Sequence, residues 1–154
     1  MNCTVVSNYV AGTDNIRAGG IVFIGGEYDK VAVTNCIISG NWNKHVDGTS
    51  ACAHNAAKSS NAKVILSHTL LDNWAEIDPD AEGCQTGDPL LVDSEGHDWR
   101  LGKRSPCRDA GVTFDFMKGG KDLDGRPRVS HKDLVDLGCY EADYIAPCTL
   151  LILR

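Results

Sequence analysis

The chain has 154 residues, a formal net charge of −6 and 42% apolar residues. This length and composition predict one globular domain with a packed core. The acidic balance and the lack of any Lys/Arg run argue against a nucleic-acid partner. No apolar stretch reaches the roughly 18 residues that indicate a membrane-spanning helix.

The first half of the chain repeats itself at a regular interval. The motif Asn2–Ser7 returns 33 positions later at Asn35–Ser39, and a third copy follows at His68–Asp72. Asn8 and Asn41 obey the same shift. A period of this size indicates stacked structural repeats, each of which buries its apolar face against its neighbours.

The apolar runs inside each repeat are short and bounded by turn residues, as is typical of strands. Val31–Val33 and Val64–Leu66 precede the second and third copies of the motif. Stacked coils of three short strands lie about 4.8 Å apart, so equivalent side chains form ladders. We expect Cys3 and Cys36 to form an inward ladder. The Asn residues should form another at a bend, where Asn tolerates left-handed backbone.

Seven cysteines are many for this length, and an odd number leaves one thiol unpaired in an exported protein. Cys36 fits a small buried apolar residue, and Cys107 could pair with Cys84 or Cys139. The chain contains no Cys-x-x-Cys motif, so the sequence does not indicate structural zinc.

The segment from Asp88 to Glu141 contains several turn signals in order. Asp88-Pro89 bends the chain before the extended run Leu90–Val92, and Ser105-Pro106 and Asp124-Gly125 mark further turns. Short apolar runs alternate with these turns, and no long helical period is present. This half of the chain therefore also predicts all-β structure.

The same segment carries the motifs DPLLVDSEGHDWRLGKRSPCRDAG, DLDGRPR and VDLGCYEAD. In this order they resemble the closing segment of right-handed parallel β-helix proteins of the pectin-lyase-like, choice-of-anchor group. The departures from that pattern are Leu91 in place of Phe, Arg108 in place of an aliphatic residue and Cys139 in place of Ala. The resemblance implies an all-β fold, a right-handed parallel β-helix of few coils with an irregular C-terminal capping segment.

On this interpretation residues 1–87 form the coils, and residues 88–154 form a terminal-coil and capping segment of the same domain, folded over the last coil. The first coil motif directly follows Met1, with no secretory signal and no N-terminal cap before it. We therefore expect either a fragment of a longer protein or a homo-oligomer that pairs through the open first coil. The family resemblance implies an extracellular or cell-surface location for a longer parent protein.

The resemblance also implies a carbohydrate-active protein, related to glycosidases or polysaccharide lyases that act on plant or bacterial polysaccharide. The alternatives are a non-catalytic glycan-binding or surface-adhesion module and a purely structural end module, because fold does not determine function. Whether the chain is an enzyme stays open at this point.

Three aspartates could supply catalytic carboxylates. Asp14, Asp47 and Asp80 are spaced by the same 33 positions, so they could share one side of the stack. On neighbouring coils their carboxylates would lie about 5 Å apart, which suits a retaining glycosidase. All three also fit ordinary turn residues in polar loops. His68 occupies the ladder position of Asn2 and Asn35, where a bend-stabilising hydrogen bond would explain it.

Two further residue pairs could bind ligands. Trp42 and Trp74, which follow the later two copies of the motif, could form a flat sugar-binding platform on adjacent coils, or they could simply pack. Asp122 and Asp124 resemble part of a calcium loop, in which carboxylates alternate with spacers before a Gly turn. The basic residues that follow Asp124 fit the terminal turn of the family instead, so a calcium site and a structural turn both remain open.

Overall fold

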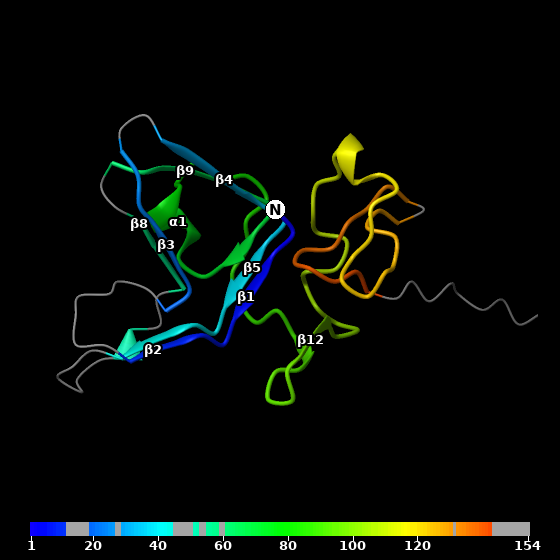
Figure 1. The fold of residues 1–154 in the computed structure, drawn as a ribbon, viewed down its shortest axis with the longest axis horizontal. Helices are drawn as coiled ribbons and strands as arrows, with labels where there is room; N and C mark the ends of the chain where they lie inside the picture. Colours follow the sequence, from blue (N-terminus) through cyan, green and yellow to red (C-terminus); the bar gives the residue numbers. More distant parts are fainter. Residues whose placement is uncertain are drawn as a thin grey trace, which may run out of the picture.

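The computed structural model describes residues 1–11, 19–26, 29–44, 51–52, 55–58, 61–130 and 132–142. Strands are the main regular structure of these residues, and helix is confined to one short α-helix and one 3₁₀ turn, which confirms the all-β class (Figure 1). The elements are β1 (Thr4–Val6), β2 (Tyr9–Ala11), β3 (Ile21–Phe23), β4 (Lys30–Thr34), β5 (Ile37–Ser39), β6 (Trp42–Lys44), β7 (Ala51–Cys52), β8 (Ala56–Lys58), β9 (Lys63–Ser67), β10 (Leu70–Leu71), α1 (Trp74–Ile77), β11 (Leu91–Asp93), β12 (Asp98–Leu101) and the 3₁₀ turn Asp115–Met117.

The strands of successive repeats pair in parallel at the predicted spacing. Thr4 of β1 pairs with Ile37 of β5, and Ile37 pairs with Leu70 of β10. The five residues of β4 pair one to one with those of β9, from Lys30↔Lys63 onward. Each of these pairs joins residues 33 positions apart, so the predicted period is confirmed in the register.

A third parallel ladder joins β3 to β8, but its register is longer by two positions, as in Ile21↔Ala56. The additional positions lie within the excursion of the second repeat, which contains β6, β7 and their antiparallel pairing. Variation in this loop does not disturb the other ladders, since the chain regains its regular register at β9.

The bends that connect the ladders have left-handed backbone. The φ angles of Asn2, Asn35 and His68 are 54°, 54° and 44°, and Gly83 continues the row at 64°. Beyond β10 the chain makes one shorter coil, because Ser67 bridges in parallel to Glu82. The predicted Asn bend is confirmed, and His68 stands at the bend with its Nδ1 2.8 Å from the Ser67 hydroxyl.

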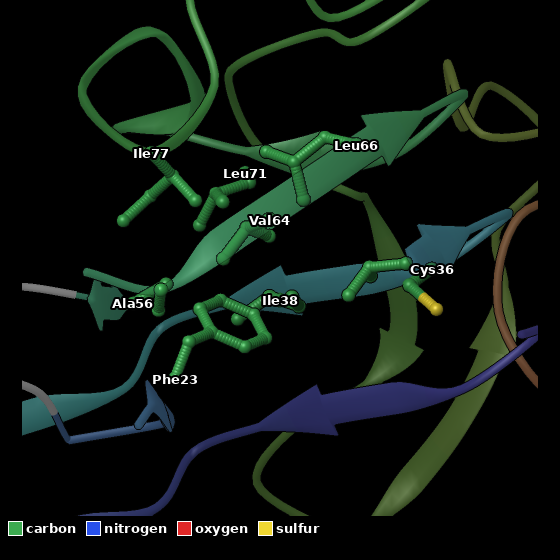
Figure 2. Close-up of a cluster of buried hydrophobic side chains, with 10 residues drawn as sticks. Phe23, Cys36, Ile38, Ala56, Val64, Leu66, Leu71 and Ile77 are labelled. Atoms are coloured by element: carbon green, nitrogen blue, oxygen red, sulfur yellow. The ribbon is translucent and has the colours of Figure 1, made fainter. Parts of the chain in front are cut away.

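The core lies between the ladders β1–β5–β10, β3–β8 and β4–β9 (Figure 2). Side chains alternate along each strand, so Cys36 and Ile38 point inward while Ile37 points outward. Cys36 is 3% exposed, which confirms its predicted burial, whereas Cys3 in the first coil is exposed. The core cluster comprises Phe23, Val33, Cys36, Ile38, Ala56, Ala62, Val64, Leu66, Leu71 and Ile77.

A polar ladder of amides runs beside this core. The Asn8 side chain donates to Asn41 Oδ1 at 2.9 Å, and the Asn41 amide donates to Asn55 Oδ1 at 3.0 Å. Asn55 in turn donates to Asp72 at 3.1 Å. Asn41 and Asn55 are buried, so these mutual bonds satisfy polar groups that would otherwise be costly to desolvate. The predicted stacking of Asn8 with Asn41 is confirmed.

The far end of the stack is closed by α1 and the residues next to it. Ile77 is buried in the core beneath the last coil. Asp78 accepts a hydrogen bond from the backbone N–H of Leu66, and the Asn73 side chain donates to the carbonyl of Ala56. These side chains thus satisfy backbone groups at the free edges of β9 and β8. Another strand is therefore less able to pair with these edges.

The chain beyond residue 87 packs on the outer face of the β1–β5–β10 sheet. Figure 1 shows this part of the chain beside β1 and β5. Its Leu101, Cys107 and Leu137 form a second apolar cluster with the outward residues Ile37 and Leu70. The terminal segment therefore covers the outward apolar residues of this sheet, including Leu70 of the third repeat, while α1 packs beside the core.

The Asn35 amide holds the terminal segment to the stack. Its Nδ2 donates to the carbonyl of Val112 at 2.8 Å, and its Oδ1 accepts the N–H of Val112 at 2.9 Å. Gly138 donates to the carbonyl of Asn35, and Cys139 donates to the Thr4 hydroxyl of the first coil. These hydrogen bonds join the terminal segment to the first two repeats.

The inward residues of the first repeat are more exposed than their partners in the second repeat. Val31 is 37% exposed, whereas its partner Val64 in the next coil is 5% exposed. Cys3 is exposed above the buried Cys36 in the same way. The inward rows of the first coil are therefore only partly covered.

The thiols of Cys84, Cys107 and Cys139 are free, so the predicted pairing of Cys107 is not formed. No helix in the part of the chain that the structure describes is long and apolar enough to cross a bilayer.

The inward row formed by Cys3 and Cys36 provides two matched substitutions that test the register. Cys36→Asp places a charge in the core and should lower the free energy of unfolding by about 3 kcal/mol or more. Cys3→Asp makes the same change at the exposed end of the same row and should cost about 0.5 kcal/mol or less. Urea unfolding of both variants measures the difference, and equal losses would contradict this register.

Candidate functional site

An exposed pair of aromatic side chains lies on the sheet formed by β2, β6 and β7. Tyr9 of β2 and Trp42 of β6 are directly paired in parallel register. Tyr9 is 60% exposed and Trp42 is 51% exposed, and neither belongs to an apolar core cluster. Two large aromatic side chains thus stand one strand apart, about 4.8 Å, on the surface.

The polar ladder fixes the position of these aromatics. Asn8 and Asn41 immediately precede Tyr9 and Trp42, and their side chains are hydrogen-bonded to each other. The Trp42 N–H also donates to the carbonyl of Asn8 at 2.8 Å. In addition, a Cβ on Gly19 would collide with the backbone of Trp42, so only Gly allows the chain to pass there. The backbone beneath the pair is therefore rigidly held.

An exposed aromatic pair on a rigid strand scaffold can bind the flat apolar face of a ligand. Tyr and Trp each combine a large apolar ring with one polar group, which suits ligands with apolar and hydroxylated faces. Sugars have this character. An exposed apolar patch of this kind also marks interaction surfaces in general.

The second tryptophan of the predicted platform has a different role. Trp74 lies on α1, is half-buried and packs against the core cluster. The neighbour of Trp42 in the adjacent coil is Tyr9, not Trp74. Tyr9 precedes Trp42 by one full period, so the spacing of the repeats alone could have identified it.

The catalytic aspartates can be placed only in part. Asp14 and Asp47 lie outside the described residues. Asp80 is exposed just after α1, and its backbone N–H donates to the Asp78 carboxylate at 3.3 Å. The predicted carboxylate pair therefore stays a prediction.

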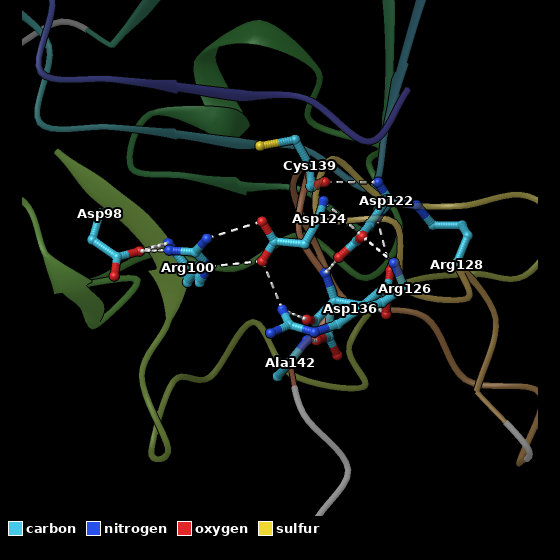
Figure 3. A network of polar contacts seen from close by, with 10 residues as sticks. Asp98, Arg100, Asp122, Asp124, Arg126, Arg128, Asp136, Cys139 and Ala142 are labelled. Carbon is cyan, nitrogen blue, oxygen red and sulfur yellow. Dashed lines mark hydrogen bonds and ion pairs between the residues drawn. The ribbon is translucent and has the colours of Figure 1, made fainter.

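Asp122 is buried within a network of polar contacts in the terminal segment (Figure 3). Its Oδ1 accepts the backbone N–H groups of Asp124 and Arg126, at 2.9 and 2.8 Å. Its Oδ2 accepts the N–H of Glu141 at 2.8 Å. Asp122 thereby ties the Asp-Leu-Asp-Gly turn to the end of the terminal segment.

Asp124 is engaged by two guanidinium groups. Arg100 donates to both of its carboxylate oxygens, at 2.7 and 2.9 Å, and Arg126 donates to Oδ2 at 2.9 Å. The hydrogen bonds from Arg100 lower the pKa of Asp124. A calcium ion at Asp122 and Asp124 would have to displace these donors, and no group of three or more carboxylate, His or Cys ligands is formed within the described ranges. Calcium stays a prediction that the contacts do not support.

A buried contact between an arginine and a glutamate lies next to this network. Arg128 Nη1 is 2.8 Å from Glu141 Oε1, and both side chains are only 9% exposed. The other oxygen of Glu141 accepts the N–H of Asp136 at 3.1 Å. Asp136 itself accepts the N–H groups of Asp109 and Ala142. The carboxylates of the terminal motifs therefore hold its turns together, which explains their presence without catalysis.

Burial raises the pKa of Glu141 to about 8, although the charge of Arg128 acts in the opposite direction. Burial likewise raises the pKa of Asp136. Both groups thus hold their protons more tightly in the folded chain than in the unfolded chain.

Comparison of the chain with protein-family models, with curated proteins and with solved structures gives no match. The site must therefore be interpreted from its own geometry.

The raised pKa of Glu141 predicts a pH-dependent stability. In the unfolded chain this carboxyl loses its proton near its ordinary pKa of 4.5, whereas the folded chain keeps it until about pH 8. The folded state binds more protons in this window, so its stability should fall as the pH rises from 5 to about 8. Melting temperatures measured across that range test the slope.

Glu141→Gln should flatten this pH dependence. The control is Asp115→Asn, because Asp115 is exposed and its pKa is lowered by a hydrogen bond from Lys118, outside the window. An unchanged slope in Glu141→Gln would show that other groups cause the pH dependence.

Proposed function

We propose that this chain is a short right-handed parallel β-helix that binds glycans without cleaving them. Parallel ladders around one core, left-handed bends and the regular register of successive repeats support the architecture. The order of the terminal motifs, which resembles that of pectin-lyase-like proteins, supports it independently. A glycan-binding role fits an extracellular or cell-surface location.

The observation that carries the binding role is the in-register exposure of Tyr9 and Trp42 on adjacent strands. Large apolar side chains that are exposed next to each other mark surfaces that a ligand or partner covers. Their backbone is fixed by the Asn8–Asn41 hydrogen bond, so little conformational entropy is lost when a ligand binds. The surface is open, which suits a segment of a polysaccharide chain.

The non-catalytic form of the proposal follows from the described carboxylates. Glycoside hydrolysis needs two carboxyl groups at a defined separation near the scissile bond. The buried carboxylates Asp122, Asp136 and Glu141 accept backbone N–H groups and belong to the terminal segment. They stabilise the fold and do not line the aromatic surface. The predicted catalytic residues Asp14 and Asp47 lie outside the described residues, and the binding role does not need them.

Substitution of the aromatic pair tests the proposal. In affinity electrophoresis through gels that contain neutral or acidic polysaccharides, at least one polysaccharide should retard the wild-type chain. Tyr9→Ala and Trp42→Ala should each weaken that binding about tenfold or more, since a buried aromatic contact contributes about 1.5 kcal/mol. Their melting temperatures should stay close to that of the wild type, because both side chains are exposed.

The control is Phe116→Ala, which removes an aromatic side chain that is 70% exposed in the terminal segment. It should leave binding unchanged. Equal losses in all three variants, or no retardation by any polysaccharide, would overturn the glycan-binding proposal. Release of reducing sugar from the same polysaccharides, lost in Asp47→Asn, would instead establish a glycosidase.

We also propose that two copies of this chain associate through the open first coil. β1 is an edge strand of its sheet, and the inward rows beside it are partly exposed at Val31. A second copy stacked head to head would cover both edges with one twofold contact. The aromatic pair would then be presented twice, which would strengthen binding to a polymer.

Light scattering should therefore give a mass of about twice 16.6 kDa at micromolar concentration. Val31→Lys places a charge in the contact and should shift the chain to the monomer. The matched control is Val92→Lys on β11, an exposed position in the terminal segment. A monomeric wild type would contradict the association.

A further inference from the structure

Two cysteines of successive coils lie next to each other at the open end. Cys3 and Cys36 immediately precede the paired residues Thr4 and Ile37, and the Ile37 N–H donates to the carbonyl of Cys3 at 2.9 Å. They are therefore opposite each other on adjacent parallel strands. Cys3 is exposed and Cys36 is buried, and both thiols are free.

The two side chains also have the same orientation. The Cys3 Sγ donates to the carbonyl of Met1 at 3.3 Å, and the Cys36 Sγ donates to the carbonyl of Thr34 at 3.2 Å. Each thiol thus contacts the carbonyl two residues before it. Equivalent conformations place the sulfur atoms one above the other on the same side of the sheet.

We propose that Cys3 and Cys36 are a modification site at which a low-molecular-weight disulfide, such as glutathione disulfide, forms a reversible intramolecular disulfide bond. In-register residues of neighbouring strands have Cα atoms about 4.8 Å apart, within the range of about 4.4–6.8 Å found in disulfides. The usual Cβ separation is somewhat shorter, so the strands must approach slightly. In the monomer β1 is an edge strand with a neighbour on one side only, so it can make this movement. The head-to-head dimer proposed above would cover Cys3, so the exchange starts from the monomer.

The chemistry proceeds in two exchange steps. The exposed Cys3 thiolate attacks the glutathione disulfide, which forms a mixed disulfide and releases one glutathione thiolate. The Cys36 thiolate then attacks the Cys3 sulfur of the mixed disulfide and releases the second glutathione. In total two protein thiols are oxidised and one glutathione disulfide is reduced to two thiols. Burial raises the pKa of the Cys36 thiol, so the second step should be the slower one.

The register also excludes Cys84 as a disulfide partner of Cys36. Leu70 bridges to Gln85, so Cys84 follows Thr69 in the row that begins with Cys3 and Cys36. Cys84 is thus two strand spacings from Cys36, about 10 Å, which is beyond disulfide reach. The first two coils are therefore joined selectively.

A disulfide here would tie the first coil to the second, and these are the coils that carry Tyr9 and Trp42. The cross-link closes a loop of the unfolded chain and should raise the melting temperature by several degrees. This inference rests on the thiol geometry and does not depend on glycan binding.

Peptide mapping tests the site directly. The full chain is treated with glutathione disulfide, alkylated without reduction and digested with trypsin. The expected product joins the peptide of residues 1–17 to that of residues 31–44, which contain only Cys3 and only Cys36 as cysteines. The intact chain should lose the mass of two hydrogens, its melting temperature should rise, and dithiothreitol should reverse both changes.

Two variants keep the test selective. Cys36→Ala should stop at the mixed disulfide of Cys3 with glutathione, whereas Cys84→Ser should cross-link like the wild type. If wild-type Cys3 only accumulates glutathione, if Cys36 is found linked to another cysteine, or if both stay reduced, the proposed site is wrong.

Discussion

The whole structure depends on the stacking of equivalent residues in successive repeats. Parallel pairing at one full period places Thr4, Ile37 and Leu70 in one row and sends the next residue of each strand to the opposite face. A slip of one residue would turn Ile38 outward and Ile37 inward, and both faces would change at once. The amide ladder resists such a slip, because Asn41 is buried with bonds that only the observed register satisfies.

Strand β5 is covered on both faces, which explains how so few repeats form a stable unit. Inward residues of β5 fill the core, and its outward residue Ile37 is covered by Leu137 and its neighbours in the terminal segment. The acidic residues of that segment act locally: Asp122, Asp136 and Glu141 bind backbone N–H groups and so shape the turns that carry the apolar cover. The exposed pair Tyr9 and Trp42 belongs to neither apolar cluster, so its substitution should not change the core.

The sequence predicted the features that repeat and missed those that depend on tertiary contacts. Equal spacing was sufficient to predict the Cys36 row and the Asn bends, because residues at equivalent positions of successive repeats lie next to each other in a stack. The longer register of β3 with β8 was not predictable, since it depends on a loop excursion. For Trp74 the sequence left a platform and simple packing open. The structure shows packing: after Leu71 the chain turns into α1, where Trp74 packs against the core, and no periodic signal marks so short a helix. The turn motifs beyond residue 87 indicated an irregular segment but not the face it covers, because that choice depends on Ile37 and Leu70 needing cover.

Methyl nuclear Overhauser spectroscopy tests the register most directly, because inward and outward methyl groups of neighbouring residues occupy separate environments. Stacking at one full period predicts strong cross-peaks between Ile38 and Leu71 in the core, and between Ile37 and Leu70 outside it. Ile37 should also show a cross-peak to Leu137 of the terminal segment. Strong cross-peaks from Ile38 to Leu70 and from Ile37 to Leu71, with none from Ile37 to Leu137, would contradict the stacked register and the two-sided burial that follows from it.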